Sequence, residues 1–194
     1  MRHSTLSALI LAPLLGACVS VLPEPSTPDA LYRVEAQQKF EGLSHHLIIR
    51  EPEAPRLIAG AGMVSEGADD GLRLIPGVEW SGSATRQIQL AMIDSFEVGQ
   101  RGNAMLPEMG VLAGYELASQ LKTLGLNGTT ASCVMTVSVI TTRNRELLAL
   151  TEVTAVEQSD SNSGRDRAAA LRNVASRCAA QAAQFAVDAL AAAD

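Results

Sequence analysis

The feature that most constrains the fold is a long β-branched run, TTASCVMTVSVITT, at Thr129–Thr142. Its side chains alternate between two faces, as those of a strand do. One face carries Cys133, Met135, Val137 and Val139, and the other carries Val134, Thr136, Ser138 and Ile140. Arg143-Asn144 can turn the chain, after which Glu146–Val156 alternates again. The pattern predicts a β-hairpin over residues 129–157.

A second segment, Pro76 to Gly99, predicts a capped helix at about 82–97. Pro76-Gly77 is typical of the end of a strand. Ser81 or Ser83 can accept a hydrogen bond from the first N–H groups of the helix, and Gly99 can end it. Apolar residues share one helical face, and polar residues lie on the other: Ile88, Ala91, Met92 and Phe96 against Arg86, Gln87, Gln89, Asp94 and Glu97. We expect Trp80, the only tryptophan, and Phe96 to be structural core residues.

The remaining periodic segments predict further strands and one long C-terminal helix. The expected strands are Leu31–Ala36, Leu43–Arg50, Arg56–Val64, Leu72–Ile75 and Gly114–Leu124. Residues 165–192 carry an apolar stripe at helical spacing, made of Leu171, Val174, Cys178, Ala182, Phe185 and Ala189. A chain of 194 residues can build one well-buried core. The fold class is therefore α/β: a single domain with a mixed, largely antiparallel sheet packed with two main helices, about 82–97 and 165–192.

The N-terminus has the pattern of a bacterial lipoprotein signal. Residues 1–17 combine Arg2 with an apolar run, Leu6–Leu15, that is too short for a membrane helix. Leu15-Gly16-Ala17 then precedes Cys18 as a lipobox precedes its lipidated cysteine. We expect residues 1–17 to be removed and Cys18 to carry the lipid, because several acyl chains on one residue anchor a protein stably. Residues 18–29, with three prolines, predict a semi-rigid tether before a folded domain at 30–194.

Composition narrows the classes of partner. The formal net charge is −6, from 15 basic and 21 acidic residues. An acidic chain of this kind is not expected to bind nucleic acid. The chain contains no run of 18 or more apolar residues, so contact with a membrane is expected through the lipid anchor alone.

The same residues resemble one family. Pro76-Gly77-Val78-Glu79-Trp80 followed by Ile93-Asp94-Ser95-Phe96-Glu97 is similar to the motif of the ABC-type transport auxiliary lipoproteins, which are PqiC-like. Ser81-Gly82 departs from the acidic residue that often follows the family's tryptophan. The resemblance covers about residues 30–190 and implies an accessory subunit of an Mce-associated transporter of lipids or other hydrophobic molecules. Its implied partners are an Mce-type substrate-binding protein and the ABC transporter complex.

The expected location is the periplasmic side of the outer membrane of a Gram-negative bacterium. Val19, not aspartate, follows the lipidated cysteine, which in enteric lipoproteins favours the outer membrane. Two other classes stay open: a lipid-binding lipoprotein with a pocket between sheet and helices, and an envelope-assembly lipoprotein unrelated to transport. Self-association into a homo-oligomer also stays open.

Residues with catalytic or metal-binding potential are few. Cys133 and Cys178 both fall on core-facing positions, which is compatible with a disulfide or with two separate buried thiols. His45 and His46 are adjacent on a predicted strand and so point to opposite faces, which disfavours a shared metal ion. No serine elbow or Cys–His context supports a nucleophile. We therefore expect no enzymatic activity, no cofactor and no metal.

Overall fold

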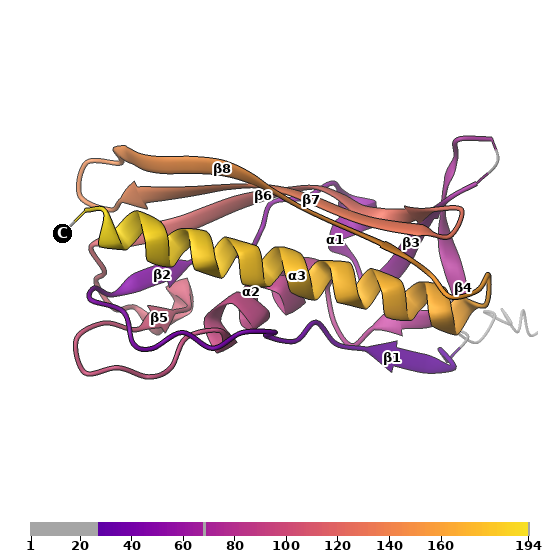
Figure 1. The fold of residues 1–194 in the computed structure, drawn as a ribbon, viewed down its shortest axis with the longest axis horizontal. Coiled ribbons are helices and arrows are strands. Elements are labelled where there is room, and N and C mark those ends of the chain that lie inside the picture. Colours follow the sequence, from indigo (N-terminus) through magenta and orange to yellow (C-terminus); the bar gives the residue numbers. More distant parts are fainter. Residues whose placement is uncertain (1–26, 68, 194) are drawn as a thin grey trace, which may run out of the picture.

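Strand β6 (Tyr115–Asn127) is the centre of an eight-stranded mixed sheet (Figure 1). The computed structural model describes residues 27–67 and 69–193, so Cys18 and the predicted signal lie outside the described residues. The other elements, in chain order, are β1 (Ala30–Tyr32), β2 (Leu47–Ile49), α1 (Arg56–Ala59), β3 (Gly62–Glu66), β4 (Leu72–Trp80), α2 (Ala84–Asp94), β5 (Ala104–Met105), the 3-10 helix η1 (Pro107–Met109), β7 (Thr130–Thr141), β8 (Leu147–Gln158) and α3 (Gly164–Ala191).

The predicted hairpin is confirmed as β7 and β8, which pair antiparallel along most of their length. β6 pairs antiparallel with the other side of β7. The inward side chains of β7 are fully buried: Ala131, Cys133, Met135, Val137 and Val139. A bulge in β6 between Leu121 and Thr123 shifts its alternation, so that Leu124 and Leu126 also point into the core.

The other side of β6 is shared by two short groups of strands. Near its start β6 pairs in parallel with β2, which in turn pairs with β5. Near its end β6 pairs in parallel with β3, which leads to β4 and β1. An isolated bridge between Glu53 and Gln120 lies between the two groups. The sheet is therefore mixed, and its long pairings are antiparallel, as predicted.

The long helix α3 lies across the sheet and contacts β8, β7, β6, β4 and β1 (Figure 1). Its buried face is made largely of alanine, which allows the helix backbone to approach the sheet closely. The buried alanines are Ala168, Ala170, Ala175, Ala179, Ala182, Ala183, Ala186 and Ala189. Ser163 begins the helix by accepting a hydrogen bond from the Asp166 N–H. No helix within the described residues is both long enough and apolar enough to cross a membrane.

Helix α2 packs against α3 and starts where Ser83, one of the two predicted caps, accepts from the Arg86 N–H at 3.4 Å. Trp80, just before it at the end of β4, is buried in the core. The predicted end at Gly99 is wrong, because the helix stops at Asp94. Beyond it Phe96 pairs with Phe40, whose N–H donates to the Ser95 carbonyl and whose carbonyl accepts from the Glu97 N–H. The pairing of Phe96 with Phe40 therefore ends the helix before Gly99 is reached.

The predicted strand Arg56–Val64 is also wrong in its first half. Residues Arg56–Ala59 form α1, and only Gly62 onward is extended as β3. Pro55 precedes the helix, and its carbonyl accepts from the N–H groups of Ile58 and Ala59, both at 2.9 Å. Pro55 is thus the N-cap residue, and the hydrogen bonds to its carbonyl close a helical turn that the apolar alternation did not predict.

Pro76-Gly77 lies inside a strand and does not end one. β4 continues from Leu72 to Trp80, with a register shift against β3 at this dipeptide. Gly77 has φ +75°, which a glycine adopts without strain, and its carbonyl accepts from the Asp29 N–H at 2.8 Å. The dipeptide therefore forms a bulge, after which β4 pairs with β1.

The other differences are in length. The predicted strands Leu31–Ala36 and Leu43–Arg50 reduce to β1 and β2, of three residues each. Gly114–Leu124 extends to Asn127 as β6. The segment between α2 and β6, for which the sequence predicted no element, contains β5 and η1.

A disulfide joins Cys133 of β7 to Cys178 of α3, with their Cα atoms 6.5 Å apart. Both cysteines are fully buried. The bond ties the helix to the middle of the sheet across a sequence separation of 45 residues. Of the two arrangements compatible with the sequence, the structure has the bridge, and its formation in the purified protein is a prediction.

We predict that thiol titration of the denatured, unreduced protein detects neither Cys133 nor Cys178. Closing a loop of 45 residues restricts the unfolded chain, so reduction is expected to lower the free energy of unfolding by about 2–4 kcal/mol. The measurement is urea unfolding with and without reductant, and a Cys133→Ala/Cys178→Ala variant should be insensitive to the reductant. Two reactive thiols beyond Cys18 would contradict the bridge.

Candidate functional site

The structure places the tryptophan, phenylalanine and histidines noted in the sequence at separate positions. Trp80 and Phe96, which precede and follow α2 in the chain, lie in the core and are 2% and 7% exposed. His46 Nδ1 accepts from the Asn103 N–H at 3.2 Å, and the ring of His45 lies 5.3 Å from that of Tyr115. Within residues 27–67 and 69–193, no three His, Cys, Asp or Glu side chains come close enough to hold a metal ion.

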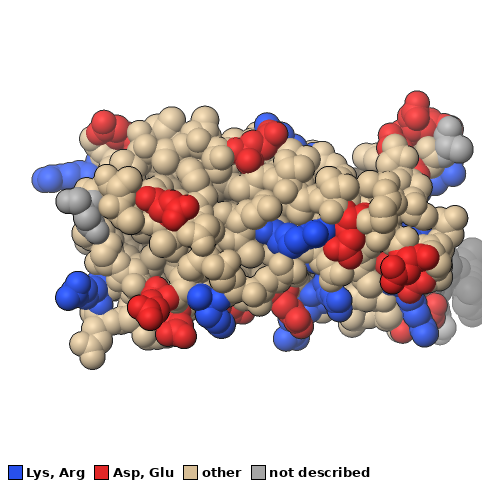
Figure 2. All heavy atoms as spheres, viewed as in Figure 1, with Lys and Arg blue, Asp and Glu red and all other residues tan. Residues whose placement is uncertain are grey.

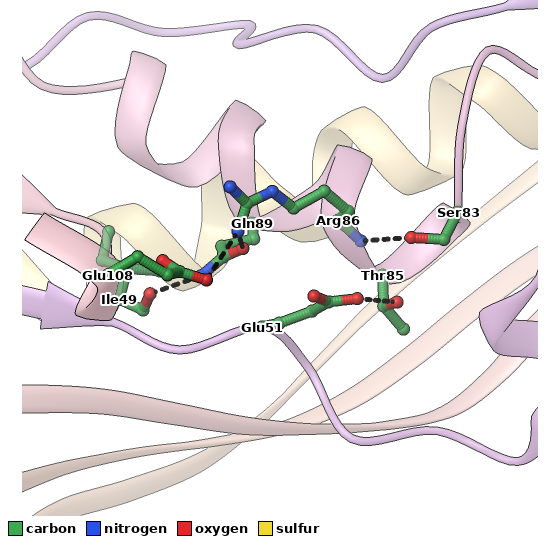
Figure 3. Close-up of polar contacts among 7 residues, drawn as sticks. All are labelled: Ile49, Glu51, Ser83, Thr85, Arg86, Gln89 and Glu108. Atoms are coloured by element: carbon green, nitrogen blue, oxygen red, sulfur yellow. Dashed lines mark hydrogen bonds and ion pairs between the residues drawn. The ribbon is translucent and has the colours of Figure 1, made fainter.

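Polar side chains on α2 fix this helix to the strands beneath it (Figure 3). Thr85 Oγ1 donates to Glu51 in the segment after β2. Gln89 Nε2 donates to the Ile49 carbonyl at 2.7 Å, and Gln89 Oε1 accepts from Arg86 at 2.7 Å. Because Gln89 is only 1% exposed, its side-chain amide satisfies a strand carbonyl that water cannot reach.

Arg86 extends the network to the loop that follows β5. Its guanidinium also contacts Glu108 of η1 at 3.3 Å. Figure 3 shows the Arg86 guanidinium reaching both Gln89 and Glu108, so that one side chain connects α2 and η1. The two elements form the walls of a cleft.

An apolar cleft of about 640 Å³ opens between the end of α2, β5 and η1. Its volume is in the range of small-molecule sites. Apolar side chains dominate its lining: Ile93, Phe96, Val98, Ala104, Met105 and Met109. Val98 and Met109 are 95% and 60% exposed at its mouth. Lys39, Asp94 and Glu97 supply charges near the opening.

One asparagine closes the loop that forms a wall of the cleft. Asn103 Oδ1 accepts from the Gly99 N–H at 2.9 Å, and its Nδ2 donates to the Gly99 carbonyl at 3.1 Å. Lys39 Nζ donates to the Asp94 carbonyl at the end of α2. The arrangement can hold an apolar group of a ligand, with few polar groups to orient it.

The space between sheet and helices is filled by side chains. Met63, Met92, Leu121 and Met135 are all fully buried in one continuous core. If the protein had a lipid pocket between the sheet and the helices, these side chains would line it. The cleft at the end of α2 lies outside this packed core and offers an apolar ligand space that the core does not.

A second buried polar group lies at the start of β6. Glu116 is 3% exposed and contacts Arg50 at 2.7 Å and Arg145 at 3.1 Å. Burial alone would raise the pKa of Glu116, but hydrogen bonds from Arg50 and Arg145, with their charges, outweigh it and hold that pKa below the usual range. The carboxylate ties the end of β2 to the β7–β8 turn.

Sequence reasoning missed Thr85, Gln89 and Glu116. It placed Gln89 on the solvent side of α2, where the neighbouring Leu90 in fact lies 38% exposed. The partners of Gln89 and Glu116, Ile49 and Arg50, come from a distant strand, so no local spacing signals either contact.

We predict that Glu116→Gln lowers the free energy of unfolding at pH 7 by about 1–2 kcal/mol, because both arginine contacts lose their charge partner. A glutamate with a lowered folded-state pKa stabilises the fold above its unfolded pKa. The difference between variant and parent should therefore vanish as the pH falls below about 4 and through the lowered pKa. The measurement is urea unfolding across this range.

Glu152→Gln is the matched control for that series. Glu152 pairs with Lys122 at 2.7 Å, but both side chains are about half exposed. We expect a change within about 0.5 kcal/mol at every pH. Equal effects of the two substitutions would contradict a special role for the buried carboxylate.

Comparison with known proteins places this architecture in a family. The family profile of the "ABC-type transport auxiliary lipoprotein component" matches residues 17–183. A crystal structure of a Xanthomonas campestris protein assigned to the family DUF330 has a TM-score of 0.71 at 15% identity, covering 84% of this chain and 94% of that one. Another crystal structure, of an uncharacterised protein, has a TM-score of 0.59 at 10% identity, covering 83% and 99%.

No curated protein matches the sequence. The structural similarities, at these identities, establish the fold, a mixed α/β domain with a curled sheet. The profile match extends over most of the chain and agrees with the resemblance carried by the Pro76–Trp80 and Ile93–Glu97 motifs. The chain therefore belongs to the ABC-type transport auxiliary lipoprotein family.

Proposed function

We propose that this protein is a lipid-anchored, periplasm-facing accessory subunit of an Mce-associated ABC transporter that moves lipids or other hydrophobic molecules. The observation that carries the proposal is the family match over residues 17–183. The proposed partners are an Mce-type substrate-binding protein and its transporter complex. The proposal assigns no catalytic step to the chain.

Cys18 is the residue with a direct role in this proposal. The lipobox Leu15-Gly16-Ala17-Cys18 supports lipidation, and Val19 supports the outer membrane as the location. The described chain begins at Thr27. Two residues later, the Asp29 N–H donates to the Gly77 carbonyl of β4. A lipid at Cys18 would hold the molecule by its β1–β4 end.

A packed body supports a mechanical role in this arrangement. The core between the sheet and α3 is continuous and crossed by the Cys133–Cys178 disulfide. Such a body can hold a partner at a fixed distance from the membrane. Both charge signs are scattered over the face shown in Figure 2, without a large patch of one sign. Partner contact through a single charged surface is therefore not favoured on that face.

We predict that the full-length lipoprotein, purified from mildly solubilised membranes, brings down an Mce protein with its ATPase and permease. Mass spectrometry of the bound proteins is the measurement. Cys18→Ser should move the protein from the membrane to the soluble fraction, because the acyl chains supply the anchoring energy. Repeated recovery of the lipoprotein alone, or with envelope-assembly factors, would overturn the proposal.

The apolar cleft favours a second candidate, a lipid-binding lipoprotein. We predict, for this candidate, that lipid extracted from the purified protein is lost in Ala104→Trp, because the indole fills the cleft lined by Ala104 and Met105. Leu72→Trp, at a position 55% exposed on β4, is the control and should keep the lipid. Lipid mass spectrometry is the measurement, and equal lipid content in all three proteins would exclude the cleft as the binding site.

A further inference from the structure

The outer edge of β8 is unpaired in the part of the chain that the structure describes. β8 pairs with β7 on one side, and no described strand pairs with the other. It is 12 residues long. A strand edge of this length presents rows of backbone N–H and C=O groups that can template another strand. We call the backbone of Leu147–Gln158 on the side away from β7 the open edge.

A hydrogen bond from α3 shows which backbone groups of β8 point outward. The Arg177 guanidinium donates to the Val156 carbonyl at 3.0 Å, so this carbonyl points away from β7. Backbone groups of alternate residues in a strand point to the same side. The register with β7 is regular from Ala149 to Gln158, so Leu150, Glu152 and Thr154 also direct their N–H and C=O groups outward.

The open edge has little of the protection that natural edge strands carry. Residues 147–158 contain no proline and no lysine. A bulge opposite Val139 and Ile140 interrupts its first residues, and Arg177, paired with Glu157 at 2.8 Å, covers its last. Between these limits the edge is exposed, and Leu150 is 60% exposed beside it. The upper margin of Figure 2, where Figure 1 shows β8, carries separate charged groups of both signs and no large patch of one sign.

A cleft beside the edge offers space for the side chains of an added strand. It has a volume of about 410 Å³ and lies between β8, α3 and the segment after β1, and its lining mixes apolar and polar side chains: Gln37, Gln38, Thr151, Val153, Arg177, Ala180, Gln181, Gln184, Phe185 and Asp188. Side chains of a strand alternate between its two faces. An added strand would therefore place every second side chain in this cleft and the others beside Leu150 and Glu152.

We propose that the open edge of β8 binds an extended segment of a partner protein as an additional strand. Backbone hydrogen bonds to Leu150, Glu152 and Thr154 provide the affinity, as in other strand additions. An apolar residue of the segment faces Leu150, and a hydroxyl residue faces the Glu152 carboxylate, whose charge Lys122 already balances at 2.7 Å. The inference rests on the proposed function only in taking the partner to be a transporter subunit.

A second copy of this chain fits the edge less well. In a two-fold antiparallel pairing centred on Glu152, the two carboxylates would face each other, each with its own Lys122 beside it, which crowds like charges at one point. Centred on Val153, the pairing sets Leu150 opposite Val156, whose carbonyl already accepts from Arg177. A heterologous segment avoids both conflicts.

The test is photo-crosslinking from Leu150 of the full-length lipoprotein in its own cells, in parent, Thr154→Pro and Thr154→Val backgrounds. Proline removes the outward N–H of Thr154, which β7 does not use, and edge strands tolerate it there. We expect crosslinks to one segment of one other protein, reduced about tenfold or more by Thr154→Pro and changed less than about twofold by Thr154→Val.

Leu150→Lys, with the crosslinker moved to Glu152, is the second variant. It keeps every backbone group and cannot disturb the core, since Leu150 is exposed. The lysine should also reduce crosslinking, because charged side chains block edge pairing. Crosslinks that persist in Thr154→Pro, that join only two copies of this chain, or that never form would overturn the inference. If transporter proteins still co-purify with the Thr154→Pro variant while crosslinking persists, the proposed function stands and only the inference about the open edge fails.

Discussion

The close packing of the alanine face of α3 against the curled sheet is the interaction on which the rest of the fold depends. Alanine side chains such as Ala175, Ala179 and Ala182 let the helix backbone approach the sheet, and each is fully buried. Larger side chains would hold the helix away and leave voids around the small residues. Because α3 touches strands from both ends of the sheet, its position sets the curvature that brings β1 and β8 to opposite margins of the molecule (Figure 1).

The central strand β6 explains why the surface features lie where they do. One side of β6 is occupied along its length by β7, whereas the other is divided between β2 and β3. The division produces two short-stranded ends around one well-packed middle. The apolar cleft lies at the β2–β5 end, and the bulge at Pro76-Gly77 lies at the β4 end. The apolar cleft thus lies where the strands are short, whereas the long β7–β8 pairing ends in an edge of β8 that no described strand pairs with.

The sequence predicted elements in which one periodic pattern runs for many residues, and it failed where a contact from elsewhere in the chain decides the local structure. The β7–β8 hairpin and α3 follow from alternation and helical spacing alone. The end of α2 depends on Phe40 pairing with Phe96, which no spacing near Gly99 reveals. The burial of polar side chains was not predicted for the same reason. Gln89 is buried because it binds the Ile49 carbonyl, 40 residues earlier in the chain. From its helical position alone it belongs on the polar face.

The two ends of the molecule differ in what they can do within the proposed function. The described chain enters beside β4, where Asp29 binds the Gly77 bulge, and a lipid at Cys18 would hold this end. The cleft lies at the opposite end of the long axis, near β5 (Figure 1). The open edge of β8 runs along the length between them. A strand bound there would lie along the body, so anchor, partner and cleft could all be engaged at once without competing for one surface. That separation follows from the strand order, and it requires no movement of the packed core.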